Sequence, residues 1–115
     1  MNIEERVYKK LLDVPKGKIT TYGVLAKAVG LKNGQRVIGR IMNKNPYPGL
    51  VPCHRVVKSD KSVGGYTYGV KIKTNMLTKE GIKIKNGKVL DWEKSFPFLI
   101  LIPSFVSMLV LILTP

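Results

Sequence analysis

Residues 20–42 read TTYGVLAKAVGLKNGQRVIGRIM, and this stretch decides the fold that the sequence predicts. Apolar residues recur at spacings of three and four in its first part, which predicts a helix over Tyr22–Val29 that Gly30 ends. The same spacing predicts another helix from residue 33 or 34 to Met42. Two short helices joined by a few residues that include glycine are typical of a helix-turn-helix, although an ordinary corner between two helices has the same pattern.

Three more predicted elements flank this pair. An apolar stripe predicts a helix over Ile3–Val14 with Asn2 as its N-cap, and Lys71–Glu80 is expected to form a further helix. Apolar and basic residues alternate over Ile82–Leu90 around Asn-Gly at 86–87, the dipeptide preferred in two-residue hairpin turns. The expected fold is therefore mainly α with a small β part, and a helix-turn-helix followed by a basic hairpin resembles a winged helix-turn-helix DNA-binding domain.

The composition limits the classes of function. The 115 residues allow one domain, and an apolar fraction of 44% allows a small core. A single cysteine excludes a disulfide within the chain and a cysteine-cluster zinc site, and a single histidine argues against a metal centre built from protein ligands. The net charge of +13 favours a polyanionic partner, with nucleic acid first and an anionic membrane surface second.

The C-terminal residues differ in character from the rest. All charged residues lie between Glu4 and Lys94, so we expect a basic domain over residues 1–94 and an apolar tail over residues 95–115. The uncharged segment Phe96–Leu113 reaches the length of a membrane span, about 17–25 residues. Three interpretations stay open: a frameshifted C-terminus, a membrane anchor with the basic domain in the cytoplasm, or a tail packed on the domain.

The segment VPCHRVV at 51–57 contains the single cysteine and the single histidine side by side. A cysteine is a nucleophile as its thiolate, which a neighbouring imidazole or cation stabilises. On a strand Cys53 and His54 would point to opposite faces, and a tight turn or a bridging water would be needed to bring them together. A buried core cysteine beside a structural histidine is the competing interpretation.

The motif PCHRV at 52–56 resembles the active site of the O6-alkylguanine-DNA alkyltransferases, also called methylated-DNA–protein-cysteine methyltransferases. Five further motifs in matching order extend the resemblance over residues 7–90: TYGVLA at 21–26, RVIG at 36–39, NKNP at 43–46, VGGY at 63–66 and LTKEG at 77–81. The resemblance implies a protein that extrudes O6-methylguanine from duplex DNA and transfers the alkyl group irreversibly to a cysteine. It also implies a monomer that needs no cofactor and works in the cytoplasm at the nucleoid.

The resemblance assigns the reacting groups residue by residue. Cys53 lies at the acceptor position and is expected to be the nucleophile. His54 matches the base that takes the thiol proton through a water, and Glu80 matches the carboxylate that orients the imidazole. Asn45 matches an asparagine that braces the turn before the active segment, and Tyr22 matches a tyrosine whose hydroxyl reaches the extruded guanine and the adjacent phosphate.

Further matches imply contacts with DNA. Arg36 matches the finger that fills the gap in the base stack, and Gly39 matches a small residue that lets its helix approach the DNA backbone in the minor groove. Tyr66 and Thr67 match a loop that closes over the base and donates hydrogen bonds near O6. Arg55 follows the family pattern and is expected to be structural or to contact phosphate.

The walls of the base pocket complete the assigned positions. Met42 matches an apolar wall residue, and Val56 is expected to line the edge of the base together with its backbone. The resemblance implies no metal ligands.

Two departures from the family pattern keep alternatives open. Many members carry an unrelated N-terminal domain, so the chain is expected to correspond to the DNA-binding and catalytic domain alone. The alkyltransferase-like proteins are of this size, lack the acceptor cysteine and recognise alkylated DNA without repairing it; the presence of Cys53 argues for transfer. A winged-helix regulator with an inert Cys53 is the third alternative, because Gln35, Arg36 and Arg40 could read bases.

Overall fold

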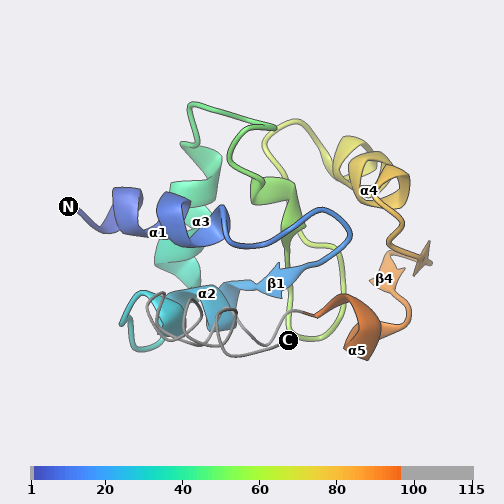
Figure 1. Ribbon diagram of the computed structural model, residues 1–115, viewed down its shortest axis with the longest axis horizontal. Helices are drawn as coiled ribbons and strands as arrows, with labels where there is room; N and C mark the ends of the chain where they lie inside the picture. The colour runs from blue at the N-terminus through green and yellow to red at the C-terminus, as the bar shows by residue number, and fades with distance from the viewer. Residues whose placement is uncertain (1, 97–115) are drawn as a thin grey trace, which may run out of the picture.

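The computed structural model describes residues 2–96, so the predicted tail lies outside the described residues except for its first two positions. Helices and strands follow in the order α1 (Ile3–Leu11), β1 (Thr20–Thr21), α2 (Tyr22–Ala28), α3 (Gln35–Asn43), the 3₁₀ turn η1 (Cys53–Arg55), β2 (Val56–Val57), α4 (Val70–Lys79), β3 (Ile84–Lys85), β4 (Lys88–Val89) and α5 (Trp92–Ser95) (Figure 1). The fold is mostly helical with few strands, which confirms the expected class.

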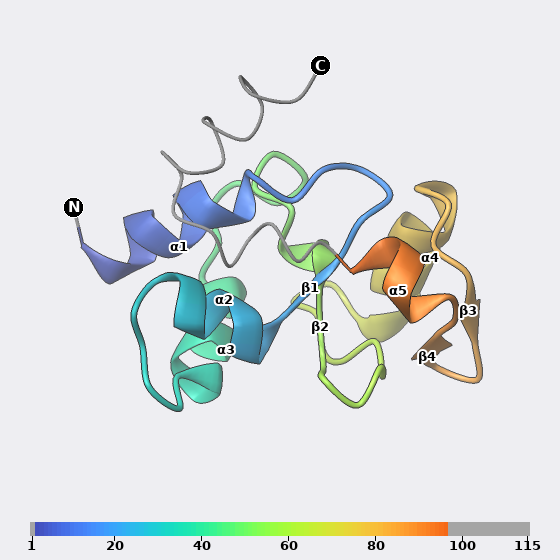
Figure 2. The same cartoon turned by 60° about the horizontal axis from the view of Figure 1, so that its bottom comes forward.

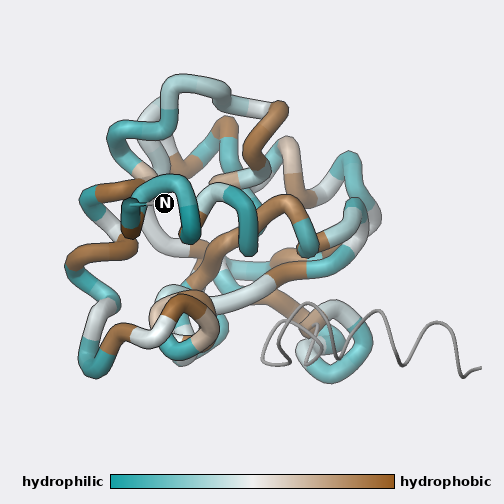
Figure 3. Tube along the Cα trace, turned by 60° about the vertical axis from the view of Figure 1, so that its left-hand side comes forward, coloured by the Kyte–Doolittle hydropathy of each residue, from teal (hydrophilic) through white to brown (hydrophobic). Residues whose placement is uncertain are grey.

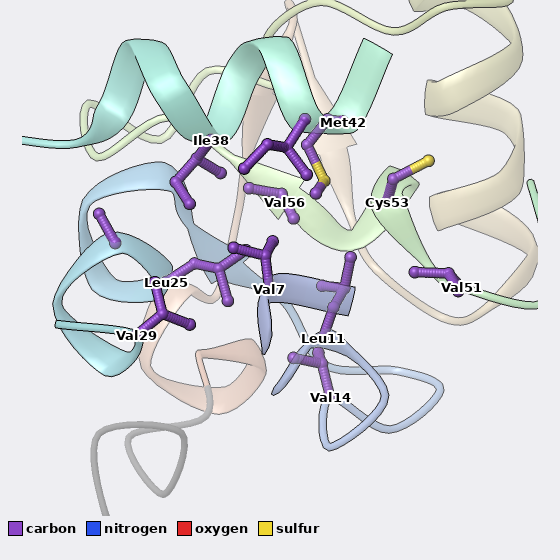
Figure 4. Close-up of a cluster of buried hydrophobic side chains, with 12 residues drawn as sticks. Val7, Leu11, Val14, Leu25, Val29, Ile38, Met42, Val51, Cys53 and Val56 are labelled. Carbon is purple, nitrogen blue, oxygen red and sulfur yellow. The ribbon is translucent and has the colours of Figure 1, made fainter. Parts of the chain in front are cut away.

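Helices α1, α2 and α3 pack around the larger of two apolar cores, and the chain before β2 completes it (Figure 4). Its side chains include Val7, Leu11, Val14, Leu25, Val29, Ile38, Met42, Val51, Cys53 and Val56. Along the trace, apolar segments alternate with hydrophilic ones, as expected for amphipathic elements that turn one face to a core (Figure 3). The cysteine that carries the proposed chemistry therefore lies at the edge of the main core.

The ends of the first helices follow from local sequence signals. The side chains of Asn2 and Thr21 each accept a hydrogen bond from a backbone N–H in the first turn, at 2.8 and 3.1 Å. This confirms the N-cap expected at Asn2 and shows that Thr21 caps α2. Helix α1 ends at Leu11, earlier than the predicted end at Val14. The residue before a proline avoids the helical conformation, and Val14 precedes Pro15, so residues 12–14 form a turn instead.

The smaller core joins α4, the β3–β4 hairpin and α5. It contains Ile19, Val57, Val63, Leu77, Ile82 and Val89. The turn residues Asn86 (φ 52°) and Gly87 (φ 75°) both lie in the left-handed region, which confirms the expected hairpin turn. Helix α5 was not predicted and spans the proposed boundary between residues 94 and 95; Ser95 is buried, and its carbonyl accepts a hydrogen bond from the Ile19 N–H at 2.9 Å.

Two short parallel strands connect the two cores (Figure 2). In this pairing Thr20 lies opposite Val56 and Thr21 lies opposite Val57. Strand β1 leads directly into α2, and β2 directly follows η1, so the pairing holds the start of the helix-turn-helix beside the segment that contains Cys53. No periodicity in the sequence predicts this contact, because it joins residues far apart in the chain.

The helix-turn-helix and the hairpin are both present, but they lie on different sides of the molecule. Helix α3 packs with α1 and α2, whereas the hairpin lies beside α4 and α5 (Figures 1 and 2). The winged arrangement of these elements therefore stays a prediction. Within residues 2–96, no helix has the length and apolar character needed to cross a membrane.

Candidate active site

A 3₁₀ turn shapes the segment that contains the cysteine. The Arg55 N–H donates to the Pro52 carbonyl at 3.0 Å, so the backbone coils over Cys53–Arg55 instead of continuing as a strand. Cys53 is 5% exposed and His54 is 2% exposed. Of the two arrangements considered from the sequence, the tight turn is the one observed.

His54, Arg55 and Glu80 form one partly buried network, in which His54 is buried and the other two side chains are partly exposed. The Nε2 atom of His54 lies 3.1 Å from Oε2 of Glu80. The Arg55 guanidinium donates to both carboxylate oxygens, from Nε at 2.9 Å and from Nη2 at 2.6 Å, and also to the Val14 carbonyl at 2.9 Å. Glu80 is the C-cap residue of α4, so the end of that helix delivers the carboxylate to the turn. These contacts support a structural role for Arg55, and the contact with phosphate that was also expected stays a prediction.

The electrostatics of this network favour a neutral imidazole beside an ionised carboxylate. Burial lowers the pKa of His54 below its usual value, and the hydrogen bond with Glu80 offsets this effect in part. Burial alone would raise the pKa of Glu80, but the hydrogen bonds from Arg55 and His54 outweigh it and leave the pKa lowered. An ionised carboxylate accepts hydrogen bonds, so Nε2 of His54 carries the proton.

The other ring nitrogen of His54 has no partner in the described part of the chain. Its Nδ1 atom is buried and makes no hydrogen bond with any of residues 2–96. In the tautomer that Glu80 selects, Nδ1 has a free lone pair, which can accept a proton. The ring is therefore held at one side and available as a base at the other.

Cys53 lies on the wall of an open pocket of about 610 Å³. Seven of the residues assigned from the sequence line this pocket, and they come from α2, α3, η1 and the loop before α4. They are Tyr22, Arg36, Gly39, Met42, Cys53, Tyr66 and Thr67. Burial raises the pKa of the Tyr22 hydroxyl above its usual value, and a negative charge on Cys53 raises it further.

Helix α3 presents one face to the pocket. Gln35, Arg36, Gly39, Met42 and Asn43 recur at helical spacing along it and all line the cavity. A side chain at Gly39 would meet no atom within 4 Å, so the glycine leaves open space at the helix surface. Arg36 is exposed at the start of the helix, where it can reach away from the protein.

Two assigned residues lie behind the pocket and support its walls. The Asn45 side chain donates to the Val51 carbonyl at 3.0 Å and accepts from the Tyr47 N–H at 2.9 Å, which braces the loop before the active turn as expected. Val56 is fully buried, and its carbonyl accepts a hydrogen bond from Lys73. The wall role expected for the Val56 backbone is untested.

One buried cation and several residues that line the pocket were not predicted from the sequence. The side chain of Lys73 is fully buried, and Nζ donates to the carbonyls of Val56 at 2.6 Å and Gly65 at 3.0 Å. Nζ also lies 5.7 Å from the centre of the Tyr22 ring. The spacing to Leu77 was the available signal, since residues four apart share a helix face. The lining residues that were not assigned are Gly23, Gln35, Asn43, Lys58, Ser59 and Gly65.

Burial also affects the charge of Lys73. Its pKa falls from 10.5 to about 8, although a negative charge on Cys53 opposes this change. The ammonium is therefore charged at neutral pH and faces two carbonyl oxygens.

As for metals, within residues 2–96 no group of three or more His, Cys, Asp or Glu side chains is placed to hold an ion.

Comparison with known proteins gives a consistent family. Residues 2–82 match the family model described as 6-O-methylguanine DNA methyltransferase, DNA binding domain. A methylated-DNA–protein-cysteine methyltransferase of Pyrobaculum aerophilum is 49% identical over 71 residues, which cover 62% of this chain and 47% of that protein. The chain spans about half the length of this relative and 42% of the length of the methylated-DNA–protein-cysteine methyltransferase of Candida glabrata.

Solved structures give the same fold. The O6-methylguanine-DNA methyltransferase of Pyrococcus kodakaraensis matches with a TM-score of 0.65 and 42% identity, over 71% of this chain and 47% of that one. The S. pombe protein Atl1, solved with damaged DNA containing O6-carboxymethylguanine, matches with a TM-score of 0.72 and 28% identity, over 84% of this chain and 98% of that one.

Proposed function

Because the chain belongs to the O6-methylguanine DNA methyltransferase family, we propose that it repairs alkylated DNA by moving the alkyl group from guanine O6 to Sγ of Cys53. One observation carries this proposal: Cys53 lines an open pocket, and the next residue is a histidine with one nitrogen held by Glu80 and the other without a partner in residues 2–96. This is the order of nucleophile, base and orienting carboxylate that activates thiols and hydroxyls in other enzymes.

The transfer is a displacement at the alkyl carbon. The thiol proton leaves Sγ for Nδ1 of His54, directly or through a water, and the thiolate attacks the carbon. The C–O6 bond breaks, its electron pair stays on the guanine, and a proton is then delivered to the base, so that the products are a thioether and an intact guanine. A thioether does not hydrolyse under these conditions, so each protein molecule acts once.

The tyrosine at the start of α2 is placed to assist the leaving base. The Tyr22 hydroxyl is protonated at neutral pH, as tyrosine hydroxyls ordinarily are, and burial raises its pKa further. A protonated hydroxyl can donate a hydrogen bond or a proton to a guanine that gains negative charge during the displacement. The buried Lys73 ammonium near the Tyr22 ring adds a positive charge behind it.

The target base has to leave the duplex to reach this pocket, because O6 of a stacked guanine is inaccessible to in-line attack. We assign Arg36 to the gap that the base leaves, since it is exposed at the pocket rim and its planar guanidinium can hydrogen-bond to the orphaned partner base. Gly39 would let α3 approach the DNA backbone, and Tyr66 and Thr67 would close over the base. The net charge of +13 supports phosphate binding.

Intact-protein mass spectrometry tests the proposal. The full chain is mixed with a duplex that contains one O6-methylguanine, and the proposal expects a gain of one methylene, about 14 Da, located on Cys53. The Cys53→Ala variant should show no gain while it keeps its affinity for the duplex. A mass gain at any other residue, or residual transfer by the variant, would disprove the assignment of the nucleophile.

The second candidate function is recognition of the lesion without transfer. The match to Atl1, which was solved in complex with damaged DNA, favours it, because the TM-score of 0.72 is higher than the 0.65 of the Pyrococcus kodakaraensis methyltransferase. The two candidates differ in one result: a recognition protein binds the O6-methylguanine duplex more tightly than the undamaged one but its mass does not change. The His54–Glu80 pair favours transfer, because recognition alone needs no base beside a cysteine.

A further inference from the structure

We propose that three lysines, Lys58 at the edge of the pocket and Lys85 and Lys88 on the β3–β4 hairpin, form a second DNA contact that binds the phosphate backbone beside the extruded base. We call these three residues the lysine strip. The proposal extends the proposed function, because it places more of the same duplex on the protein. It assigns a DNA-binding role to the β3–β4 hairpin, and no residue of this hairpin is among those that line the pocket.

The strip starts at the pocket and continues onto the hairpin. Lys58 and Ser59 line the pocket, directly after β2. The loop that follows contains Asp60, and the carbonyl of Asp60 accepts a hydrogen bond of 3.4 Å from Nζ of Lys88 on the hairpin. The loop of residues 58–62 lies between α3 and the hairpin in both views (Figures 1 and 2).

Backbone hydrogen bonds hold this loop on the hairpin. The Val63 N–H donates to the Gly87 carbonyl at 3.0 Å, and the Val89 N–H donates to the Lys61 carbonyl at 2.9 Å. The hairpin therefore has a fixed position relative to the loop that forms part of the pocket rim. A duplex bound over the pocket would pass this loop on one side of the lesion.

The pairing within the hairpin is the observation that points to a ligand. Lys85 lies directly opposite Lys88 across the two strands, and Ile84 lies opposite Val89. Side chains alternate between faces, and Val89 is buried in the smaller core, so the two lysines share the outward face and both are exposed. Like charges directly opposite each other destabilise a hairpin. A phosphate backbone would supply the missing counter-charge.

Acidic residues nearby do not balance the strip. Asp60 is the acidic residue that interacts with it, since Lys58 and Lys88 help to lower its pKa after the larger effect of its hydrogen bonds with Ser62. The Asp60 carboxylate accepts from the Ser62 N–H at 2.9 Å and from its hydroxyl at 2.6 Å. Asp60 interacts with Lys58 and Lys88, and its one negative charge is smaller than the charge of the three lysines, so the strip keeps a net positive charge.

Lys83 on the same hairpin supplies a matched control. Its Nζ lies 3.6 Å from a carboxylate oxygen of Asp91, so this exposed lysine already has an acidic partner. Replacing Lys83 with glutamine removes the same charge from the same element as a substitution in the strip. The proposal predicts that the two kinds of substitution differ in their effect on DNA binding.

The test measures binding of the full chain to fluorescent duplexes, with and without O6-methylguanine, over a range of salt concentrations. Each phosphate contact contributes about −0.9 to the slope of log K against log salt, so K85Q/K88Q should lower the magnitude of the slope by about 1.8. Carried from 1 M to 0.1 M salt, this corresponds to about 60-fold weaker binding. The loss should be equal for damaged and undamaged DNA, and K83Q should keep the parent slope.

Stability distinguishes a lost contact from a damaged fold. The substitutions remove two positive charges that face each other across the strands, so the melting temperature of K85Q/K88Q should be unchanged or higher than that of the parent chain. A second readout uses two duplexes with the lesion about five base pairs, roughly 17 Å, from one end or from the other. The double variant should lose affinity for the duplex whose long arm passes the hairpin and not for the other.

Each outcome decides the matter. An unchanged salt slope, the same loss with K83Q, or equal losses on the two asymmetric duplexes would overturn the proposal. Loss of binding to anionic phosphatidylserine vesicles with unchanged DNA binding would assign the strip to a membrane surface and overturn it as well. If the parent chain transfers no alkyl group but the double variant shows the predicted change in slope, the proposed function fails and the lysine strip stands.

Discussion

The buried ammonium of Lys73 gives a prediction about stability that depends on pH. Its Nζ donates to the carbonyls of Val56 and Gly65, and the side chain is fully buried between α4 and the pocket. The neutral amine still has protons to donate to these carbonyls, so loss of the charge removes the cost of burying it without breaking the contacts. We therefore expect the folded protein to gain stability when Lys73 loses its proton.

The magnitude follows from the change in pKa. Burial lowers the pKa of Lys73 from 10.5 to about 8. One pKa unit corresponds to about 1.4 kcal/mol, so the buried charge costs about 3 kcal/mol below pH 8. Between about pH 8 and 10.5 the unfolded chain holds a proton that the folded chain has lost, and the free energy of unfolding rises with pH in this window.

The assay compares Lys73→Met with the parent chain by urea unfolding at pH 7 and at pH 10.5. The substitution removes the Lys73 donor from two carbonyls and is destabilising at both pH values. The informative quantity is therefore how the difference in the free energy of unfolding between parent and variant changes from pH 7 to pH 10.5. The parent should gain about 3 kcal/mol relative to Lys73→Met over this range. Lys71→Met is the control, because Lys71 is exposed on the same helix and should show no such change. A parent and a Lys73→Met variant that respond identically to pH would refute the reasoning.

Two further predictions concern the buried network. The single-turnover rate of alkyl transfer should fall as the pH is lowered, with a midpoint below that of a free imidazole, about 6.5, because burial lowers the pKa of His54 and a protonated ring cannot accept the thiol proton. A midpoint above about 6.5 would contradict this. Arg55→Gln should lower the free energy of unfolding by about 3 kcal/mol, measured by urea titration, because it leaves the Glu80 carboxylate buried without its cation. A loss below about 1 kcal/mol would show that Glu80 does not depend on Arg55.

Local signals in the sequence predicted most of the secondary structure. The capping side chain of Asn2 and the Asn-Gly turn at 86–87 depend on neighbouring residues alone, and both were predicted correctly. The pairing of β1 with β2 could not be predicted in this way, because two-residue strands leave no periodic pattern. Helix α5 was missed for a similar reason: four residues are too few for an apolar stripe.

The site shows where pattern and packing diverge. Resemblance to the family assigned seven residues that do line one pocket, although their distances in the sequence say nothing about proximity. In α4 the apolar pattern misleads, since Ile72 is 49% exposed and the neighbouring Lys73 is fully buried. Two backbone carbonyls make that burial possible, and their positions depend on the whole fold. The partner of a buried charge therefore has to be seen in the structure.

The short parallel pairing of β1 and β2 makes the geometry of the site sensitive to strand register. Tyr22 begins directly after one strand, and the turn that carries Cys53 ends directly before the other. A slip of the pairing by one residue would shift Tyr22 relative to Cys53 by about 3.3 Å along the strand direction, which is more than the length of a hydrogen bond. It would also turn buried side chains of the slipped strand outward. With two residue pairs the alignment has no redundancy. A substitution that favours the slipped pairing would abolish chemistry while both apolar cores remain folded.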